Sequence, residues 1–199
     1  MTVFRDLSQH ILDIFENGVK AGATLVHIDI EEDLKNDLLS ITVRDNGRGM
    51  DAEMVRRISD PWITTRKTRK VGLGIPFLKQ TAEMCGGDFE IQSKEGEGTI
   101  TRAAFQHSHI DRPPLGDLAS TVLCAIVGYP QVGVVYHHEV IPAEANSGEE
   151  GREFTLDTRE IREVLGEEIP LSDPDVLRYL RTTLEEGLRP LGGEARSAG

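Results

Sequence analysis

Asp45-Asn-Gly47-Arg-Gly49-Met50 is the stretch on which the predicted fold depends. Asp45 comes soon after an apolar run, residues 38–43, that is typical of a β-strand. The glycines that follow let another group approach the backbone closely. A strand that ends in a carboxylate and opens into Gly-x-Gly indicates a fixed hydrogen-bond acceptor beside an accessible backbone. A turn without any ligand would carry the same residues.

Residues 6–21 follow the helical period, with an apolar face and a polar stripe. The stripe carries His10, Asp13, Asn17 and Lys20. An amide oxygen such as that of Asn17 suits a hard cation, and a lysine suits a phosphate group. Asp13 lies one turn before Asn17, where it can hold or polarise a water molecule. An ordinary amphipathic surface helix would show the same stripe.

A cluster of positive charge, residues 64–70, stands out in a chain of net charge −12. It leads into Gly72-Leu-Gly74 and a helical pattern over residues 73–84. A basic loop that feeds a helix N-terminus favours bound phosphate groups, and a solvated basic loop is the alternative. A predicted hairpin follows, in which the Thr99 hydroxyl would reach a buried polar ligand or stabilise the turn.

Together these segments resemble the ATP-binding domain shared by gyrase, Hsp90, histidine kinases and MutL. The resemblance covers about residues 5–107, and it is closest to the histidine-kinase branch. The motifs that carry it occur in the family's order: residues 13–23, Asp45 with Gly47 and Gly49, residues 58–66, Gly72-Leu-Gly74-Ile, and the closing hairpin with Gly98-Thr99.

The resemblance implies a site for ATP and Mg²⁺. In that site Asp45 would accept a hydrogen bond from the adenine amino group, and Asn17 would bind the magnesium ion. The other nucleotide contacts that the matching positions imply are Lys20, Gly47, Gly49, Met50, Thr65, Arg66, Lys67, Arg69, Lys70, Gly72, Leu73, Gly74 and Thr99.

The chain departs from the family pattern at several positions. ATPase members carry a Glu general base where this chain has Asp13, whose shorter side chain has less reach to an attacking water. Glu16, about 60° round the helix, is a second candidate base. Ser59 and Trp62 differ from the kinase segment, and Lys70 replaces a glycine. The resemblance therefore predicts nucleotide binding and leaves the fate of the γ-phosphate open.

Three functions fit these residues: a protein kinase that acts in trans, an ATPase, and a nucleotide-gated binding module. The chain lacks the phosphoacceptor helix of true histidine kinases, so a substrate His, Ser or Thr would lie on another protein, as in the related anti-sigma serine kinases. His10 is expected to be a surface residue or a nucleotide contact and not a phosphoacceptor. A homodimer is compatible with all three functions.

The composition argues against nucleic acid and membrane as binding partners. A net charge of −12 and a pI of about 4.9 argue against nucleic acid, because a polyanion normally needs a basic face. The N-terminus lacks the apolar segment of a signal peptide, and no apolar run is long enough for a membrane span. We therefore expect a cytoplasmic protein with no membrane contact. Cys85 and Cys124 are too few for a disulfide framework or a metal site.

The predicted fold class is α+β, a two-layer α/β sandwich of the Bergerat type over residues 1–107. Its predicted elements are helices at 6–21, 51–58 and 73–84, strands at 24–31, 38–45, 87–94 and 98–107, and a lid at 59–71.

Consecutive prolines predict a linker at residues 108–116. Residues 117–191 are expected to form an α/β extension that either extends and covers the core sheet or docks a partner. Its predicted elements are a β-hairpin from residues 118–127 and 132–141, a strand at 153–156, helices at 158–165 and 173–187, and a disordered tail at 192–199.

Overall fold

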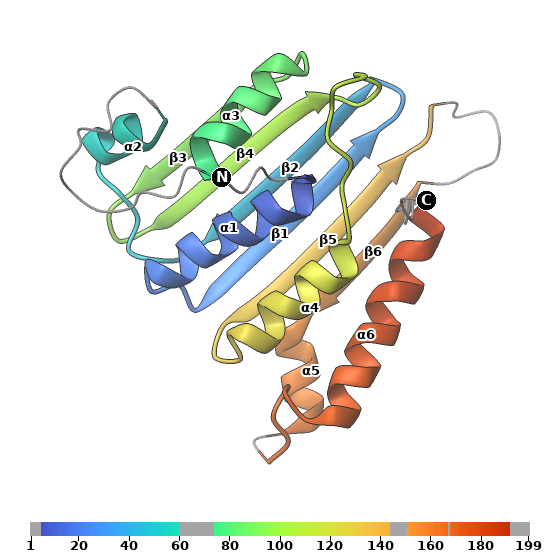
Figure 1. Ribbon diagram of the computed structural model, residues 1–199. Coiled ribbons are helices and arrows are strands. Elements are labelled where there is room, and N and C mark those ends of the chain that lie inside the picture. The colour runs from blue at the N-terminus through green and yellow to red at the C-terminus, as the bar shows by residue number, and fades with distance from the viewer. Residues whose placement is uncertain (1–4, 60–73, 144–150, 167, 192–199) are drawn as a thin grey trace.

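The computed structural model describes residues 5–59, 74–143, 151–166 and 168–191. Its strands form one mixed sheet in the order β3-β4-β2-β1-β5-β6 (Figure 1). The strands are β1 (Leu25–Asp33), β2 (Leu38–Asp45), β3 (Phe89–Lys94), β4 (Gly98–Gln106), β5 (Gly133–Ile141) and β6 (Arg152–Asp157). The helices are α1 (Leu7–Lys20), α2 (Ala52–Ser59), α3 (Gly74–Met84), α4 (Leu118–Gly128), α5 (Thr158–Leu165), α6 (Pro174–Leu188) and the 3₁₀ turn η1 (Arg189–Leu191).

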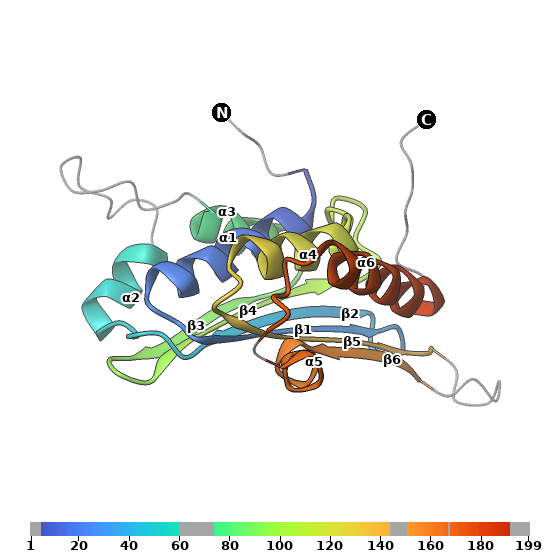
Figure 2. The same ribbon diagram turned by 90° about the horizontal axis from the view of Figure 1, so that it is seen from below.

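The molecule has two layers. Helices α1, α3, α4 and α6 lie on one face of the sheet, and α5 lies on the other (Figure 2). Alternate residues of β1, such as Val26 and Ile28, are fully buried under the helices, as the period of a strand requires. From α1 the side chains of Ile11 and Phe15 complete this core. The α+β sandwich predicted from the sequence is therefore confirmed.

The prediction for residues 118–127 was wrong, because this segment forms helix α4 and not the first strand of a hairpin. Its β-branched residues suggested a strand, but its buried positions, among them Leu118, Val122 and Ile126, recur at helical spacing. The Asp117 carboxylate caps the helix by accepting a hydrogen bond from the Ser120 N–H. The hairpin of this region instead pairs β5 with β6.

Strands β5 and β6 continue the same sheet. β5 pairs with β1 in parallel, with Val26 beside Val134, and α4 provides the crossover. The segment before α4 is tied to the start of α1, since the N–H groups of Leu7 and Ser8 donate to the Pro114 and Leu115 carbonyls, both over 2.9 Å. The second half of the chain is thus hydrogen-bonded to the first at the sheet and at α1.

A buried polar network lies where β1, β5 and the end of β4 meet. The two carboxylate oxygens of Glu32 lie 2.8 Å from His107 Nε2 and 2.9 Å from His138 Nε2. His138 is fully buried, and its Nδ1 lies 3.2 Å from the Tyr136 hydroxyl. Burial alone would raise the pKa of Glu32, but the two histidine hydrogen bonds outweigh burial and hold this pKa below its usual value. Glu32 therefore contributes to folding as a carboxylate.

We expect Glu32→Gln to lower the free energy of unfolding at pH 7 by about 1–2 kcal/mol, because an amide offers one acceptor oxygen to two imidazoles, of which that of His138 is fully buried. The lowered pKa means that the carboxylate's contribution is present above the unfolded value of about 4.3 and is lost as pH falls through the folded value. Urea unfolding at pH 7 and below pH 4 would measure this. The exposed neighbour Glu31, changed to Gln, is the matched control. Equal losses in both variants would contradict a role for the network.

Candidate nucleotide site

Helix α1 lies directly against the end of β2. Asp6 caps the helix by accepting a hydrogen bond from the Gln9 N–H over 3.1 Å, and Lys20 ends it. At Gly18 the backbone passes so close to Asp45 that an added Cβ would lie 2.8 Å from the Asp45 Cβ. Gly18 was not among the predicted site residues. Its position next to Asn17 was the available signal.

Asp45 is the buried carboxylate of the site, with 9% of its surface exposed. The Gly47 N–H donates to its Oδ1 over 2.8 Å, which fixes the orientation of the carboxylate. Burial raises the pKa of Asp45 above its usual value, while hydrogen bonds with the backbone of Gly47 and Thr99 act in the other direction. A half-desolvated acceptor of this kind is suited to a ligand N–H group.

Two glycines shape the turns around Asp45. Gly49 has φ +64° and Gly98 has φ +98°, values that favour glycine. A side chain at Gly49 would overlap the Lys94 carbonyl, and one at Gly98 would overlap the Asp45 carbonyl. Only glycine lets these two turns come together with the end of β2.

Ser93 joins the same turns, although the predicted site residues did not include it. Its Oγ accepts from the Met50 N–H over 2.9 Å, and the same oxygen lies 2.9 Å from Thr99 Oγ1. Thr99 in turn pairs with Asp45 between β4 and β2. The hairpin of β3 and β4 thereby holds the Asp45–Met50 segment in place.

These elements enclose a cavity of about 550 Å³ on the helix-covered face of the sheet. It brings together six of the residues predicted from the sequence: Asn17, Lys20, Asp45, Gly49, Met50 and Thr99. Gly47 lies behind Asp45 and contributes its N–H instead. The apolar walls of the cavity were not predicted; they are formed by Ile14, Ala21, Met54, Ile58, Ile75 and Ile91. A flat ring system would pack between such walls, and ligand sites of this size are usual in proteins.

Asp13 does not line the cavity, but it lies beside Asn17, which does, and against the start of α3. The Asn17 Nδ2 donates to Asp13 Oδ2 over 3.4 Å. Gly74, the first residue of α3, lies against the Asp13 carboxylate, where a side chain would overlap it. Burial raises the pKa of Asp13, while Lys20 and Asn17 act to lower it. A carboxylate with a raised pKa is a better proton acceptor than an ordinary surface one.

The second candidate base is already paired. Glu16 Oε2 lies 3.0 Å from Lys20 Nζ, and both side chains are substantially exposed. Neither Asp13 nor Glu16 lines the cavity, whereas Lys20 does. Of the two predicted bases, Asp13 is the one that contacts Asn17 and the start of α3.

His10 does not lie on the surface, so the first of the two alternatives expected for it was wrong. It is 4% exposed, because the start of α3 covers this side of α1. Burial lowers the pKa of His10, against the effect of its backbone hydrogen bond with Gly74. It is also not among the residues that line the cavity.

Several predicted contacts lie outside the described residues: Thr65, Arg66, Lys67, Arg69, Lys70, Gly72 and Leu73. Within the described residues, no group of three or more His, Cys, Asp or Glu side chains is arranged to hold a metal ion. None of the described helices is long and apolar enough to cross a bilayer.

Comparison with known proteins points to one family. Residues 2–109 match the family model described as histidine kinase-, DNA gyrase B-, and HSP90-like ATPase. An uncharacterised sensor-like histidine kinase of Rhizobium meliloti (strain 1021) is 31% identical over 101 residues, which are 48% of this chain and 19% of that protein. The tetrathionate sensor histidine kinase of Salmonella typhimurium (strain LT2) is 31% identical over 119 residues, 58% of this chain and 19% of that protein. The match thus spans less than a fifth of either relative.

A solved structure has a similar fold over more of the chain. The crystal structure of the N-terminal domain of a DNA repair protein superposes with a TM-score of 0.51 and 13% identity, covering 83% of this chain and 58% of that one. At this identity the likeness concerns the fold alone. The family match covers the residues that build the cavity, including α1, Asp45 and the β3–β4 hairpin. The chain belongs to the histidine kinase-, DNA gyrase B-, and HSP90-like ATPase family.

Proposed function

We propose that the cavity between α1 and the sheet binds Mg-ATP, with the adenine ring on Asp45 and the phosphates directed toward Asn17 and α3. Family membership supports ATP binding. The observation that carries the orientation is the buried Asp45 carboxylate, which lines the cavity and whose Oδ1 accepts a hydrogen bond from the Gly47 N–H. The apolar walls formed by Ile91, Met54 and their neighbours suit the faces of a purine.

The residues present fit a magnesium ion. Asn17 offers a neutral amide oxygen at the phosphate end, and Mg²⁺ is usually held by one or two protein oxygens together with phosphates and water. The absence of a protein-only metal cluster among the described residues agrees with that pattern. The bound ion would neutralise phosphate charge, and Lys20, with the basic residues 66–70, would contribute further positive charge.

We infer that the protein transfers the γ-phosphate to a hydroxyl or imidazole on a separate protein. Asp13 is the proton acceptor in this proposal, because it is half-buried, has a raised pKa and lies against Gly74 at the start of α3. Glu16 is less suited, since its carboxylate already pairs with Lys20 in an exposed position. His10 is too deeply buried to accept a phosphate without movement of α3.

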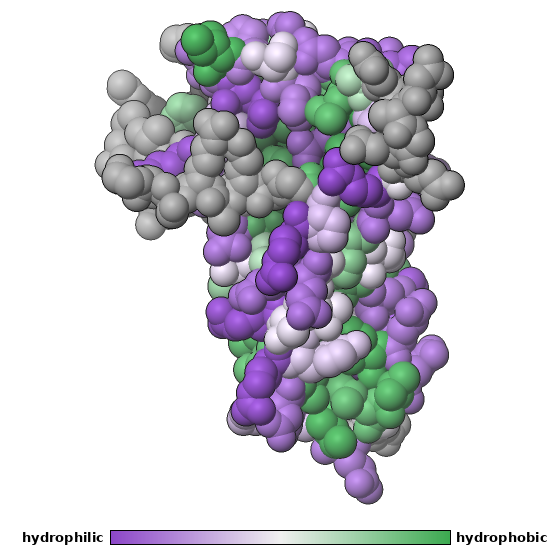
Figure 3. All heavy atoms as spheres, turned by 90° about the vertical axis from the view of Figure 1, so that its right-hand side faces the viewer, coloured by the Kyte–Doolittle hydropathy of each residue, from purple (hydrophilic) through white to green (hydrophobic). Residues whose placement is uncertain are grey.

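Hydrolysis of ATP is the second candidate, because Asp13 would serve a water molecule as well as a protein hydroxyl. Exposed apolar side chains far from the cavity favour a protein partner, and therefore phosphate transfer over hydrolysis. Val164 on α5 is 88% exposed and Ile169 is 45% exposed. Figure 3 shows apolar side chains gathered at the end of the molecule that carries α5 and the start of α6. Such patches are typical of protein contact sites, and a nucleotide-gated docking role without chemistry would use the same surface.

Two assays on the purified protein separate these functions. The first follows phosphate release from Mg-ATP, and the second uses mass spectrometry to detect phosphate on co-purified proteins. We expect slow release and clear transfer, both lost in Asn17→Ala. Rapid release without transfer would favour the ATPase. Binding without either reaction would contradict an enzymatic function and leave the gated module.

A further inference from the structure

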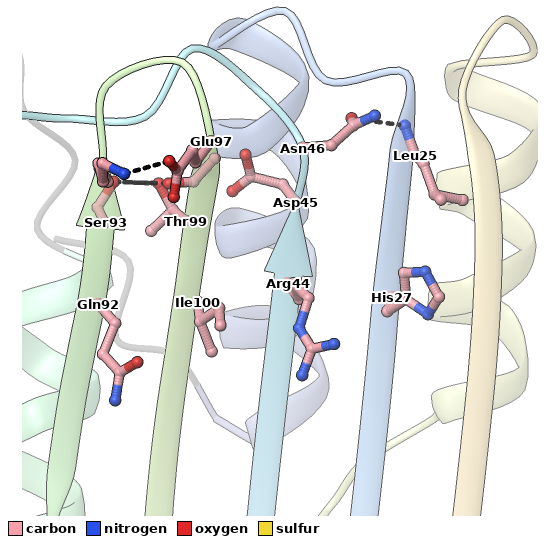
Figure 4. A pocket seen from close by; sticks show the side chains of 12 residues that line it. Leu25, His27, Arg44, Asp45, Asn46, Gln92, Ser93, Glu97, Thr99 and Ile100 are labelled. Carbon is pink, nitrogen blue, oxygen red and sulfur yellow. Dashed lines mark hydrogen bonds and ion pairs between the residues drawn. The ribbon is translucent and has the colours of Figure 1, made fainter.

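A second cavity lies on the opposite face of the sheet from the proposed ATP site and has a volume of about 440 Å³. Its floor is one row of side chains from four neighbouring strands: Gln92 pairs with Ile100, Ile100 with Arg44, and Arg44 with His27. Figure 4 shows these four side chains side by side on the same face. Because side chains alternate along a strand, this row faces away from α1, whereas Asp45 faces toward it.

The positive charge of Arg44 in this cavity has no ion-pair partner among the described residues. The Arg44 side chain is exposed, and no acidic group in the described part of the chain forms an ion pair with it. The two carboxylates that line the cavity are engaged elsewhere. Glu97 pairs with Lys94, and Asp45 turns toward Gly47 on the other face. An unpaired guanidinium in a chain of net charge −12 leaves an anion-binding group in the cavity.

Other residues of the cavity add a second donor and an apolar floor. His27 lies beside Arg44 in the row and adds an imidazole. Leu25 and Ile100 supply apolar surface next to these donors. Arg102, two residues beyond Ile100 on the same face, does not line the cavity and lies opposite Glu90 of β3. A ligand that fits these groups combines an oxyanion with an apolar body.

We propose that this cavity is a second binding site, which takes a small organic anion with a carboxylate or phosphate group. Arg44 binds the oxyanion through two parallel N–H bonds, and His27 donates a third. The apolar part of the ligand packs on Leu25 and Ile100. The cavity volume lies within the range of small-molecule sites.

The second site is built on the same turns as the ATP cavity. Asp45 and Thr99 line both cavities, one on each side of the strand ends. A ligand that shifts these turns changes the affinity for ATP, and ATP changes the affinity for the ligand by the same factor. This coupling, unlike the second site itself, rests on the proposed position of ATP.

The test is a ¹⁵N NMR titration of the full chain with phenyl phosphate, benzoate and inorganic phosphate, without nucleotide and with saturating ADP. We expect saturable shifts at the amides of Leu25, His27 and Arg44 with the two aromatic anions and weaker binding of inorganic phosphate. Arg44→Gln should weaken phenyl phosphate binding at least about tenfold, as expected when a charged hydrogen bond is lost. Arg178→Gln, an exposed arginine on α6, is the matched control.

The proposal is overturned if the shifts map to Ile91 and Thr101 on the other face, if Arg44→Gln binds as the unaltered chain does, or if inorganic phosphate binds as tightly as phenyl phosphate. For the coupling, we expect phenyl phosphate to change ATP affinity about fivefold or more. An unchanged ATP affinity would overturn the coupling. If ATP does not bind beside Asp45 at all, the titration without nucleotide still decides the second site.

Discussion

Asp45→Asn is expected to weaken ATP binding roughly 10- to 100-fold, the loss that follows when a charged hydrogen bond worth about 1.5–3 kcal/mol is removed. The Gly47 N–H donates to Oδ1, so an amide in this place would keep its oxygen toward Gly47. Its NH₂ group would then face the adenine amino group, donor against donor. Isothermal titration calorimetry with Mg-ATP measures the change.

The matched control is Asp29→Asn, on the other face of the sheet. Asp29 lies on β1 and does not line the ATP cavity, so its variant should bind ATP as the unaltered chain does. Thermal unfolding of both variants shows whether the fold is intact. Unchanged ATP affinity in a folded Asp45→Asn protein would contradict the assignment of the adenine position.

Asp13→Asn is expected to slow phosphate release or transfer roughly 100- to 10,000-fold, the usual contribution of a general base. ATP affinity should change little, because the amide has the same shape and fits beside Gly74 as the carboxylate does. Rapid-quench measurement of γ-phosphate loss, with binding measured separately, distinguishes the two effects.

Glu16→Gln is the matched control for Asp13. It removes a carboxylate from the same helix and breaks only the exposed pair with Lys20. We expect turnover in this variant within a few-fold of the unaltered chain. Persistent turnover in Asp13→Asn together with loss in Glu16→Gln would reverse the assignment of the base.

Much of the fold could be predicted because the decisive residues act locally. Gly49 and Gly98 take backbone conformations that favour glycine, and the alternation of apolar residues in β1 predicts both a strand and its buried face. The polar stripe of α1 likewise placed Asp13 and Asn17 together. These features can be read within a few residues of sequence.

What escaped prediction depends on packing between distant segments. The run at residues 118–127 has strand-forming composition, yet it becomes α4 because its helical face packs on α1 and α6. The apolar walls of the ATP cavity come from α1, α2, α3 and β3, and no local pattern relates them. The buried network joins Glu32 to His107, which lies 75 positions further along the chain, and to His138, which lies 106 positions further along.

The second half of the chain contacts helix α1 directly. The ring of Tyr129, at the end of α4, lies 5.7 Å from the ring of Phe15 on α1. Residues of α1 on its other side line the ATP cavity. A change in the position of α1 on nucleotide binding would therefore press on α4. This contact gives residues 117–191 a physical route for reporting nucleotide state in the proposed function.

The most direct test of the account is a crystal structure of the protein with Mg²⁺ and a non-hydrolysable ATP analogue. We expect the adenine amino group within hydrogen-bond distance of the Asp45 carboxylate, the ring between Met54 and Ile91, and the metal ion on the Asn17 side-chain oxygen. An analogue bound in the cavity around Arg44, or bound with its adenine away from Asp45, would contradict it.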